Sequence, residues 1–276
     1  MASFTESFDP KLCETFTSPT NIAVIKYWGK GDVKLNTPMN SSASITLDQA
    51  DLHTITTIAV SKTFAEDKLW LNGTETEIND RGKACIREIR AIAQDKIDSD
   101  GTVLVKKEDW SQYKIHIASV NTFPTGAGLA SSAAGLACFV TCLATVFAAK
   151  ETYEGQFTAI ARQGSGSASR SMFGGFVKWE KGEKADATDS IAVQIADENV
   201  RNVTFFVRRR NIRLFYRLSL EEDSIVYVHT TPIQFYVLLC TPIYSYILLY
   251  TPIHPSIHSL NTPPPYIVRR FVYVLI

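Results

Sequence analysis

The sequence lacks an excess of either charge, because its 28 Lys and Arg residues are matched by 28 Asp and Glu residues. Proteins that bind nucleic acids through phosphate backbones depend on clustered Lys and Arg, so this balance argues against a nucleic-acid partner. With 276 residues and 45% hydrophobic content, the chain has enough apolar material for one large domain or two modest ones. A small-molecule ligand is therefore the expectation.

Cysteine is scarce and shows neither a disulfide framework nor metal spacing. The chain has five cysteines, an odd number, and Cys138 and Cys142 lie one helical turn apart in an apolar run. We therefore expect reduced, mostly buried thiols and no metal site. The first residues also lack an apolar run and carry Glu6 and Asp9, so neither a signal peptide nor a transit peptide is expected. The cytoplasm is the predicted compartment.

A segment rich in glycine and serine, Asn121 to Ser132, joins the end of a predicted strand to a helix of small residues. It lacks the Gly-Lys-Ser/Thr end of a P-loop and the spacing of the dinucleotide fingerprint. Gly126 and Gly128 permit close approach of the backbone to a ligand, and the free N–H groups at a helix start favour an anion. Hydroxyls follow at Ser131 and Ser132. The segment predicts a different phosphate-binding loop, one that serves a nucleotide.

Alternating and helical patterns predict strands and helices in mixed order. The expected strands are Asn21 to Trp28, Ser44 to Leu47, Thr54 to Val60, Lys68 to Leu71, Tyr113 to Val120 and Gly175 to Trp179. The expected helices are Asp80 to Ala93, Ala127 to Ala149 and Thr152 to Arg162. Polar loops are expected at Asp95 to Asp109 and at Gly164 to Arg170. The charge-free helix from Ala127 is near the roughly 20 residues that cross a bilayer, but its many small residues favour a buried helix.

The composition changes after about Glu198. From Val200 to Ile276 there is no Gly, Ala, Lys, Met or Trp, although the earlier chain uses all five. The tripeptide Thr-Pro-Ile recurs at intervals of ten residues, beginning at Thr231, Thr241 and Thr251. Such a repeat can indicate an array, but proline breaks its helices and the unit has neither Gly nor Asn for turns.

Two interpretations of this tail remain open. One is a membrane anchor that spans Phe235 to Ile253, with Arg208 to Arg217 as a basic flank, although Pro242 lies within the span. The other, which we favour, is translated non-coding sequence from a retained intron or a frameshift. We therefore predict one domain over residues 1–199 and a poorly ordered tail over residues 200–276.

Several motifs resemble the diphosphomevalonate decarboxylase family, part of the superfamily of galactokinase, homoserine kinase, mevalonate kinase and phosphomevalonate kinase. They are NIAVIKYWGKGD from Asn21, MNSSASITL from Met39, LWLNG from Leu69, NTFPTGAGLASSAAG from Asn121 and ARQGSGSASRSMFGGFVKWEKG from Ala161. The resemblance covers Asn21 to about Asp197. Two small residues depart from the family pattern: Ser169 replaces a usual Cys, and Gly126 replaces a common Ala.

The resemblance implies an α+β fold: an amino-terminal domain of this kinase superfamily, similar to domain 2 of ribosomal protein S5, with a mixed sheet covered by helices. It also implies ATP-dependent decarboxylation of diphosphomevalonate to isopentenyl diphosphate, in the mevalonate pathway that supplies isoprenoids and sterols. ATP and Mg²⁺ are the implied cofactors, and a homodimer is the implied assembly. No membrane partner is expected. The family's second lobe is expected to be absent or replaced by the tail.

The resemblance also assigns residues. The implied substrate-binding residues are Asn21, Tyr27, Trp28, Gly29, Lys30, Arg81, Ser165, Gly166, Ser167, Ala168, Ser169 and Arg170. The implied nucleotide-binding residues are Asn121, Pro124, Gly126, Gly128, Leu129, Ala130, Ser131 and Ser132. Three side chains are expected to act in catalysis. Arg170 would hold the substrate carboxylate through two parallel hydrogen bonds, Lys26 would stabilise the hydroxyl or phosphoryl group, and Ser132 would position phosphates.

Simpler structural roles compete with some of these assignments. Lys26 and Lys30 are ordinary surface lysines if taken alone. Arg81 has an acidic neighbour for an ion pair in Glu77. Tryptophans such as Trp28 and Trp179 are more often core residues than ligand contacts, and we expect no function for Trp179. His53 and His116 are expected on the surface or on a strand, without partners.

One family feature is missing from the sequence. The family has an aspartate in its second lobe beside the reacting hydroxyl, and no segment here matches it; Asp223 lies in an unrelated acidic run. The chain is therefore expected to be inactive as written. Three readings compete: a faulty or alternatively spliced product of an enzyme gene, a binding protein without turnover, and a membrane-attached variant.

Overall fold

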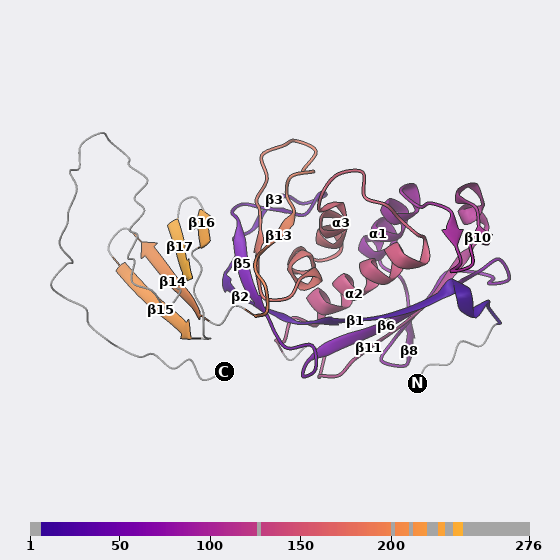
Figure 1. Cartoon of the computed structure of the whole chain (residues 1–276), viewed down its shortest axis with the longest axis horizontal. Helices are drawn as coiled ribbons and strands as arrows, with labels where there is room; N and C mark the ends of the chain where they lie inside the picture. Colours follow the sequence, from indigo (N-terminus) through magenta and orange to yellow (C-terminus); the bar gives the residue numbers. More distant parts are fainter. Residues whose placement is uncertain are drawn as a thin grey trace.

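A five-stranded mixed sheet forms the floor of the domain (Figure 1). The computed structural model describes residues 7–125 and 128–199 together with four strand segments, 202–209, 212–219, 226–229 and 234–239. The sheet order is β1 (Cys13–Pro19), β6 (His53–Ser61), β11 (Lys114–Asn121), β7 (Lys68–Leu71) and β8 (Thr74–Thr76). Only the β11–β7 pair is parallel among these strands, so the sheet is mixed, as expected.

A second, four-stranded sheet carries much of the candidate site. Its order is β13 (Ala192–Ala196), β12 (Phe176–Trp179), β5 (Ser42–Thr46) and β2 (Asn21–Ile25), and all its pairs are antiparallel. Two small ribbons accompany the sheets: β3 (Lys30–Asp32) with β4 (Thr37–Pro38), and β9 (Lys96–Ile97) with β10 (Val103–Val105). The first ribbon follows β2 directly and is close to the site in sequence.

Three α-helices lie together on one side of the five-stranded sheet (Figure 1). They are α1 (Asp80–Ala91), α2 (Ser131–Val146) and α3 (Gln156–Gly164). The side chain of Asn79 caps α1 by accepting a 2.9 Å hydrogen bond from the Gly82 N–H, which satisfies one of the free amides at the helix start. Three short 3-10 helices complete the described domain: η1 (Pro10–Leu12), η2 (Lys107–Gln112) and η3 (Gly166–Met172).

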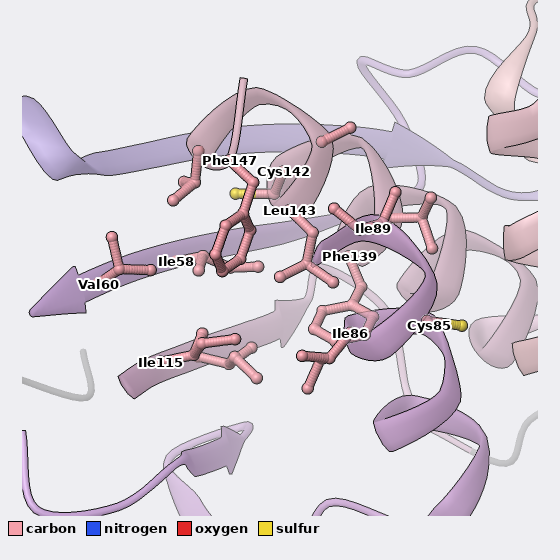
Figure 2. Close-up of a cluster of buried hydrophobic side chains, with 14 of the residues drawn as sticks. Ile58, Val60, Cys85, Ile86, Ile89, Ile115, Phe139, Cys142, Leu143 and Phe147 are labelled. Atoms are coloured by element: carbon pink, nitrogen blue, oxygen red, sulfur yellow. The ribbon is translucent and has the colours of Figure 1, made fainter. Parts of the chain in front are cut away.

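The apolar core fills the space between these helices and the sheet (Figure 2). Ile58 and Ile115 project from the sheet, and Leu143 and Phe147 meet them from α2 and its end; all four are fully buried. Isoleucine at β positions and leucine in a helix agree with local preference, so local and tertiary demands coincide here.

Most of the expected elements are confirmed, with corrections to several bounds and to two loops. The expected strand from Asn21 ends at Ile25 rather than Trp28, and the expected helix from Thr152 begins at Gln156. The expected helix from Ala127 is narrower, because α2 runs from Ser131 to Val146. The expected loop Asp95 to Asp109 is wrong, since it contains β9, β10 and η2. The expected loop Gly164 to Arg170 is also wrong, because most of it belongs to the 3-10 helix η3.

Beyond residue 199 the structure describes four paired strands. They are β14 (Asn202–Arg209), β15 (Ile212–Ser219), β16 (Val226–His229) and β17 (Gln234–Leu239), in the order β15-β14-β17-β16. The proposed span Phe235 to Ile253 therefore begins inside β17, and its remainder lies outside the described residues, as do the repeats at Thr231, Thr241 and Thr251. Within the described part, none of the helices combines the length and apolar character needed to cross a membrane.

Candidate functional site

The site is centred on η3, which β2 holds in place. The amide of Asn21 donates to the Ser167 carbonyl at 3.1 Å and to the Ser171 hydroxyl at 2.7 Å, and Asn21 itself is buried. The Ser18 hydroxyl adds a 3.0 Å hydrogen bond to the Ser171 carbonyl. Two predicted substrate residues, Asn21 and Ser167, are thus brought into contact. Asn21 orients the segment, because both donors of its amide group are used for that purpose.

Arg170 is buried at the centre of the site, with 1% of its surface exposed. Its Nε donates to the Ser44 hydroxyl at 3.0 Å, and its Nη1 donates to the Ser42 hydroxyl at 2.6 Å. Burial lowers the pKa of Arg170 to about 10. No carboxylate in the described residues forms an ion pair with it. A buried guanidinium held only by neutral hydroxyls is poised for an anionic ligand.

Two aromatic rings form the wall beside Arg170. The rings of Tyr27 and Trp179 meet edge to face with centroids 5.0 Å apart, and the Arg170 guanidinium lies 5.9 Å from the Trp179 ring centroid. Gly166 fits against this wall because it has no side chain: a Cβ there would lie 2.7 Å from Trp179 Cη2 and 3.4 Å from the Tyr27 hydroxyl oxygen. The expectation that Trp179 is a core residue is confirmed, since it is 1% exposed, although it also touches the site.

The loop that is predicted to bind phosphate meets η3 through a row of hydroxyls. Ser132 Oγ lies 3.4 Å from Ser165 Oγ, which lies 3.4 Å from Ser167 Oγ. Ser131 begins α2, and no side chain caps this helix start. Its first N–H groups therefore remain available to an anion.

The backbone before α2 is unusual. Ala130 has a positive φ of 54°, which costs a non-glycine residue energy, and Gly128 has a φ of 76°. Leu129, between them, is half-buried. Gly126 lies outside the described residues, so its predicted role stays a prediction.

An open cavity of about 610 Å³ lies beside the start of this loop. Its lining includes the predicted nucleotide residues Asn121 and Pro124 together with Asn72, Phe123 and Thr125. The amides of Asn72 and Asn121 both donate to the Thr125 hydroxyl at 3.1 Å. This polar network joins the turn after β7, the end of β11 and the loop, and it gives the cavity fixed polar groups next to the predicted phosphate-binding segment.

The lysine segment after β2 is exposed. Lys26, Lys30 and Trp28 are exposed, and Trp28 retains 60% of its surface, so it is no core residue. The backbone of this segment is nevertheless fixed, because Asn40 accepts from the Trp28 N–H at 2.8 Å and donates to the Lys26 carbonyl at 3.1 Å. Gly29 has a φ of 64°, which suits glycine. The structure therefore presents these side chains at the surface next to Tyr27.

Arg81 stays apart from the other predicted residues. It is exposed on α1, and within the described chain no hydrogen bond or ion pair connects it to η3 or to the phosphate loop. Its expected alternative is an ion pair with Glu77 or another acid, but Glu77 pairs with Lys83 at 3.2 Å instead. His116 lies on a strand, β11, as one alternative expected. The expected lack of partners is wrong, because His116 is fully buried and its ring stacks on Phe64 with centroids 3.7 Å apart.

Sequence reasoning missed the hydroxyls that hold Arg170. Ser42 and Ser44 alternate along β5, so both face the same side of the sheet, toward η3. Two serines at alternate positions of an otherwise buried strand are the signal that could have identified them, because buried hydroxyls need partners. Ala168 and Ser169 are buried within η3, where the Ser169 hydroxyl donates to the Gly166 carbonyl at 2.9 Å.

The fold and the site together define an α+β domain in which an uncapped helix start lies near a buried arginine. A family model described as the diphosphomevalonate decarboxylase-like N-terminal domain matches residues 18–192. The chain belongs to this family.

Curated relatives agree. The diphosphomevalonate decarboxylase of Rattus norvegicus is 54% identical over 189 residues, which is 68% of this chain and 45% of the relative. The human protein of the same description is 52% identical over 192 residues, or 69% of this chain and 46% of the relative. The solved mevalonate diphosphate decarboxylase from Trypanosoma brucei is 35% identical with a TM-score of 0.60, covering 72% of this chain and 51% of that one. The chain thus spans about half the length of these relatives.

Proposed function

We propose that this chain carries the nucleotide- and substrate-binding half of an ATP-dependent diphosphomevalonate decarboxylase. The observation that supports this most strongly is Arg170, a buried guanidinium without a carboxylate partner among the described residues. A substrate carboxylate is the complementary charge, and the planar fork of arginine suits two parallel hydrogen bonds. Opening of the site is required for this contact, because so little of Arg170 is exposed.

The chemistry of the proposed reaction explains why a cation and a phosphate loop belong together. The tertiary hydroxyl of the substrate attacks the γ-phosphorus of ATP, and ADP leaves. The hydroxyl loses its proton in this transfer, and its oxygen is then part of a phosphate leaving group. The C–O bond of the substrate breaks next, and its electron pair leaves with inorganic phosphate. The bond to the carboxylate breaks as well, and its electrons form the double bond of isopentenyl diphosphate as carbon dioxide leaves. In this proposal Arg170 orients the carboxylate, Ser132 positions phosphates, and Lys26 stabilises the transferred group.

Two solved relatives support nucleotide and magnesium in this site. The mevalonate diphosphate decarboxylase from Enterococcus faecalis, 33% identical with a TM-score of 0.54, has a mevalonate diphosphate mediated ATP binding mechanism. A further structure, 32% identical with a TM-score of 0.54, contains MVAPP, AMPPCP and magnesium. The described residues here contain no cluster of three acidic, His or Cys groups for a metal. The exposed Ser132 hydroxyl fits a magnesium ion carried mainly by nucleotide phosphates.

We further propose that the chain by itself binds without completing turnover. The supporting observation is the lack of a segment matching the family's second-lobe aspartate, which orients the reacting hydroxyl. Homodimer formation, a cytoplasmic location and the origin of residues 200–276 as translated non-coding sequence stay predictions. Sequencing of matched genomic DNA and transcript across Asp197 to Arg201 tests the last of these; one uninterrupted native reading frame would contradict it.

Calorimetry and a phosphate assay on the purified full chain test the binding proposal. We expect saturable binding of diphosphomevalonate and of a magnesium–ATP analogue, and no release of inorganic phosphate when diphosphomevalonate and magnesium–ATP are both present. Phosphate release at a rate comparable to an intact relative would overturn the inactive assignment. Absence of both binding events would overturn the binding proposal itself.

A further inference from the structure

A second buried arginine, Arg162, lies outside the predicted site and makes no ion pair with a described carboxylate. It is 2% exposed and projects from α3, three residues before Ser165. Its Nε donates to the Leu35 carbonyl at 3.2 Å, and its Nη1 donates to the carbonyls of Ala187, at 2.9 Å, and Ser190. These donors are directed at backbone rather than into a cavity, which indicates a positioning role.

The first loop that Arg162 holds is the ribbon of β3 and β4, which begins at Lys30. The contact is reciprocal, because the Asn36 side chain donates to the Arg162 carbonyl at 2.6 Å. Asn36 is buried and has a positive φ of 53°. Non-glycine residues keep such a conformation only where surrounding contacts impose it. The ribbon is thus fastened to α3 from both sides of this turn.

The second loop that Arg162 holds runs from Ala187 to Ser190. Ala187 is also a non-glycine residue with a positive φ, 57°. The Ser190 hydroxyl accepts from Trp179 Nε1 at 3.2 Å and donates to the Glu180 carbonyl at 2.9 Å. Trp179 in turn forms the wall beside Arg170. Arg162 therefore connects the β3–β4 ribbon that begins at Lys30, the end of α3 and the aromatic wall beside Arg170.

We propose that Arg162 is a positioning residue that sets the distance between Lys30 and the Ser165 to Arg170 segment, so that a cation and a row of serine hydroxyls face one diphosphate site. The proposal rests on the proposed function, since it takes Lys30, one of the predicted substrate-binding residues, as a ligand of the substrate diphosphate. A flexible ribbon would leave Lys30 free to sample many positions. One charge-assisted hydrogen bond from Arg162, to the Leu35 carbonyl, restricts the ribbon, and two more fix the loop from Ala187 to Ser190 against the same side chain.

The test compares three variants of the full chain. Arg162→Met keeps the length of the side chain but removes its donors. Asn36→Gly keeps the positive φ accessible and removes only the reciprocal hydrogen bond. Arg90→Met is the matched control: Arg90 is also partly buried, donates to the Tyr113 carbonyl at 2.8 Å and lies 5.5 Å from the Phe147 ring centroid, but it belongs to α1 and contacts neither loop.

Hydrogen exchange, followed by mass spectrometry, measures how often the backbone of the ribbon opens, and it needs no ligand. Loss of the charged donors in Arg162→Met should raise exchange over residues 30–38 by roughly tenfold relative to β11, and Asn36→Gly by about threefold. Arg90→Met should leave this ratio unchanged. An unchanged ratio in Arg162→Met, or an equal rise in Arg90→Met, overturns the proposal. If Arg162→Met does not fold, Asn36→Gly decides in the same way.

Inorganic pyrophosphate then tests the link to the site. Its dissociation constant should rise by about tenfold in Arg162→Met and little in Arg90→Met, with binding of a magnesium–ATP analogue at the Asn121 cavity unchanged. Unchanged pyrophosphate affinity despite an opened ribbon overturns the positioning role. A third outcome separates the two proposals. If Arg162→Met raises exchange in the ribbon but the wild-type chain binds no pyrophosphate, the proposed function is wrong, whereas the role of Arg162 in holding the ribbon is confirmed.

Discussion

The two ends of the described domain bury different kinds of side chain. Around α1, α2 and the five-stranded sheet, the buried side chains are mainly isoleucine, leucine, valine and phenylalanine. Around η3 and the four-stranded sheet, the buried set includes Arg162, Arg170 and several serines. The first end gains stability from apolar burial, whereas the second must satisfy every polar group it hides.

This difference separates stability from function. A buried charge without a charged partner costs several kcal/mol unless hydrogen bonds compensate, so a fold has little reason to retain it for stability alone. Arg162 satisfies its donors with backbone carbonyls, but Arg170 is held by only two serine hydroxyls. We infer that the apolar end supports the fold and that the polar end exists for an anionic ligand. Substitutions at the two ends should therefore have separable effects.

The largest effect is expected at the apolar end. Leu143 is fully buried in α2, so Leu143→Ala should lower the free energy of unfolding by about 2–5 kcal/mol through lost contacts and a residual cavity. Urea denaturation followed by circular dichroism measures it. Pyrophosphate affinity of the folded variant should stay within about twofold. A parallel loss of affinity would show that the two ends are not separable.

The next effect is expected at the polar end. Arg170→Met removes the guanidinium that Ser42 and Ser44 hold. Loss of charged hydrogen bonds worth about 2 kcal/mol should raise the dissociation constant of diphosphomevalonate roughly thirtyfold. Calorimetry measures the change, and Arg170→Lys serves as the control that keeps charge without the planar fork. Equal affinities for wild type and Arg170→Met would remove Arg170 from the site.

A smaller effect distinguishes two glycines. Gly166→Ala would place a Cβ 2.7 Å from Trp179, so this variant should lose about 1–2 kcal/mol of stability and bind diphosphomevalonate more weakly. A Cβ added at Gly135 in α2 would meet no neighbouring atom within 4 Å, and Gly135→Ala should raise stability by up to about 1 kcal/mol. Thermal unfolding of both variants measures the contrast. The account fails here if both changes have the same sign.

The last effect is a pH dependence at the apolar end. Burial raises the pKa of the Cys138 thiol to about 11 from an ordinary value of 9.0. The unfolded thiol loses its proton first, so the free energy of unfolding should fall as the pH rises from 9 to 11. Urea titrations at several pH values should show a shallower fall in Cys138→Ala. If the free energy of unfolding falls equally steeply with pH in both proteins, the Cys138 thiol is not the origin of the pH dependence.

The two ends also differ in how well the sequence predicts them. The sequence predicts a helix over Asp80 to Ala93, and α1 occupies Asp80–Ala91, because its buried residues recur with helical spacing. The bounds of β7, Lys68–Leu71, agree with expectation. By contrast, β9 and β10 are strands of two and three residues, too short to produce an alternating pattern.

The site is predicted unevenly for similar reasons. Glycines and serines indicate the predicted ligand segments around Ser132 and Ser165, but their pattern is typical of a loop. The helical conformation of η3 depends on tertiary contacts such as that from Asn21. The roles of Ser42 and Arg162 follow from which backbone or side chain lies opposite them in space. The alternation of Ser42 and Ser44 indicates that they share a face of the strand, but no sequence pattern identifies the partner that lies opposite them in space.

Arginine side-chain NMR gives the most direct test of the central claim that the polar end binds an anion at Arg170. The full chain, labelled with ¹⁵N at arginine, is titrated with diphosphomevalonate, and the Arg170 Nε signal is assigned from its absence in Arg170→Lys. The account predicts a saturable shift of the Arg170 signal while the Arg90 signal stays in place. An Arg170 signal that does not change at saturating diphosphomevalonate would contradict the account.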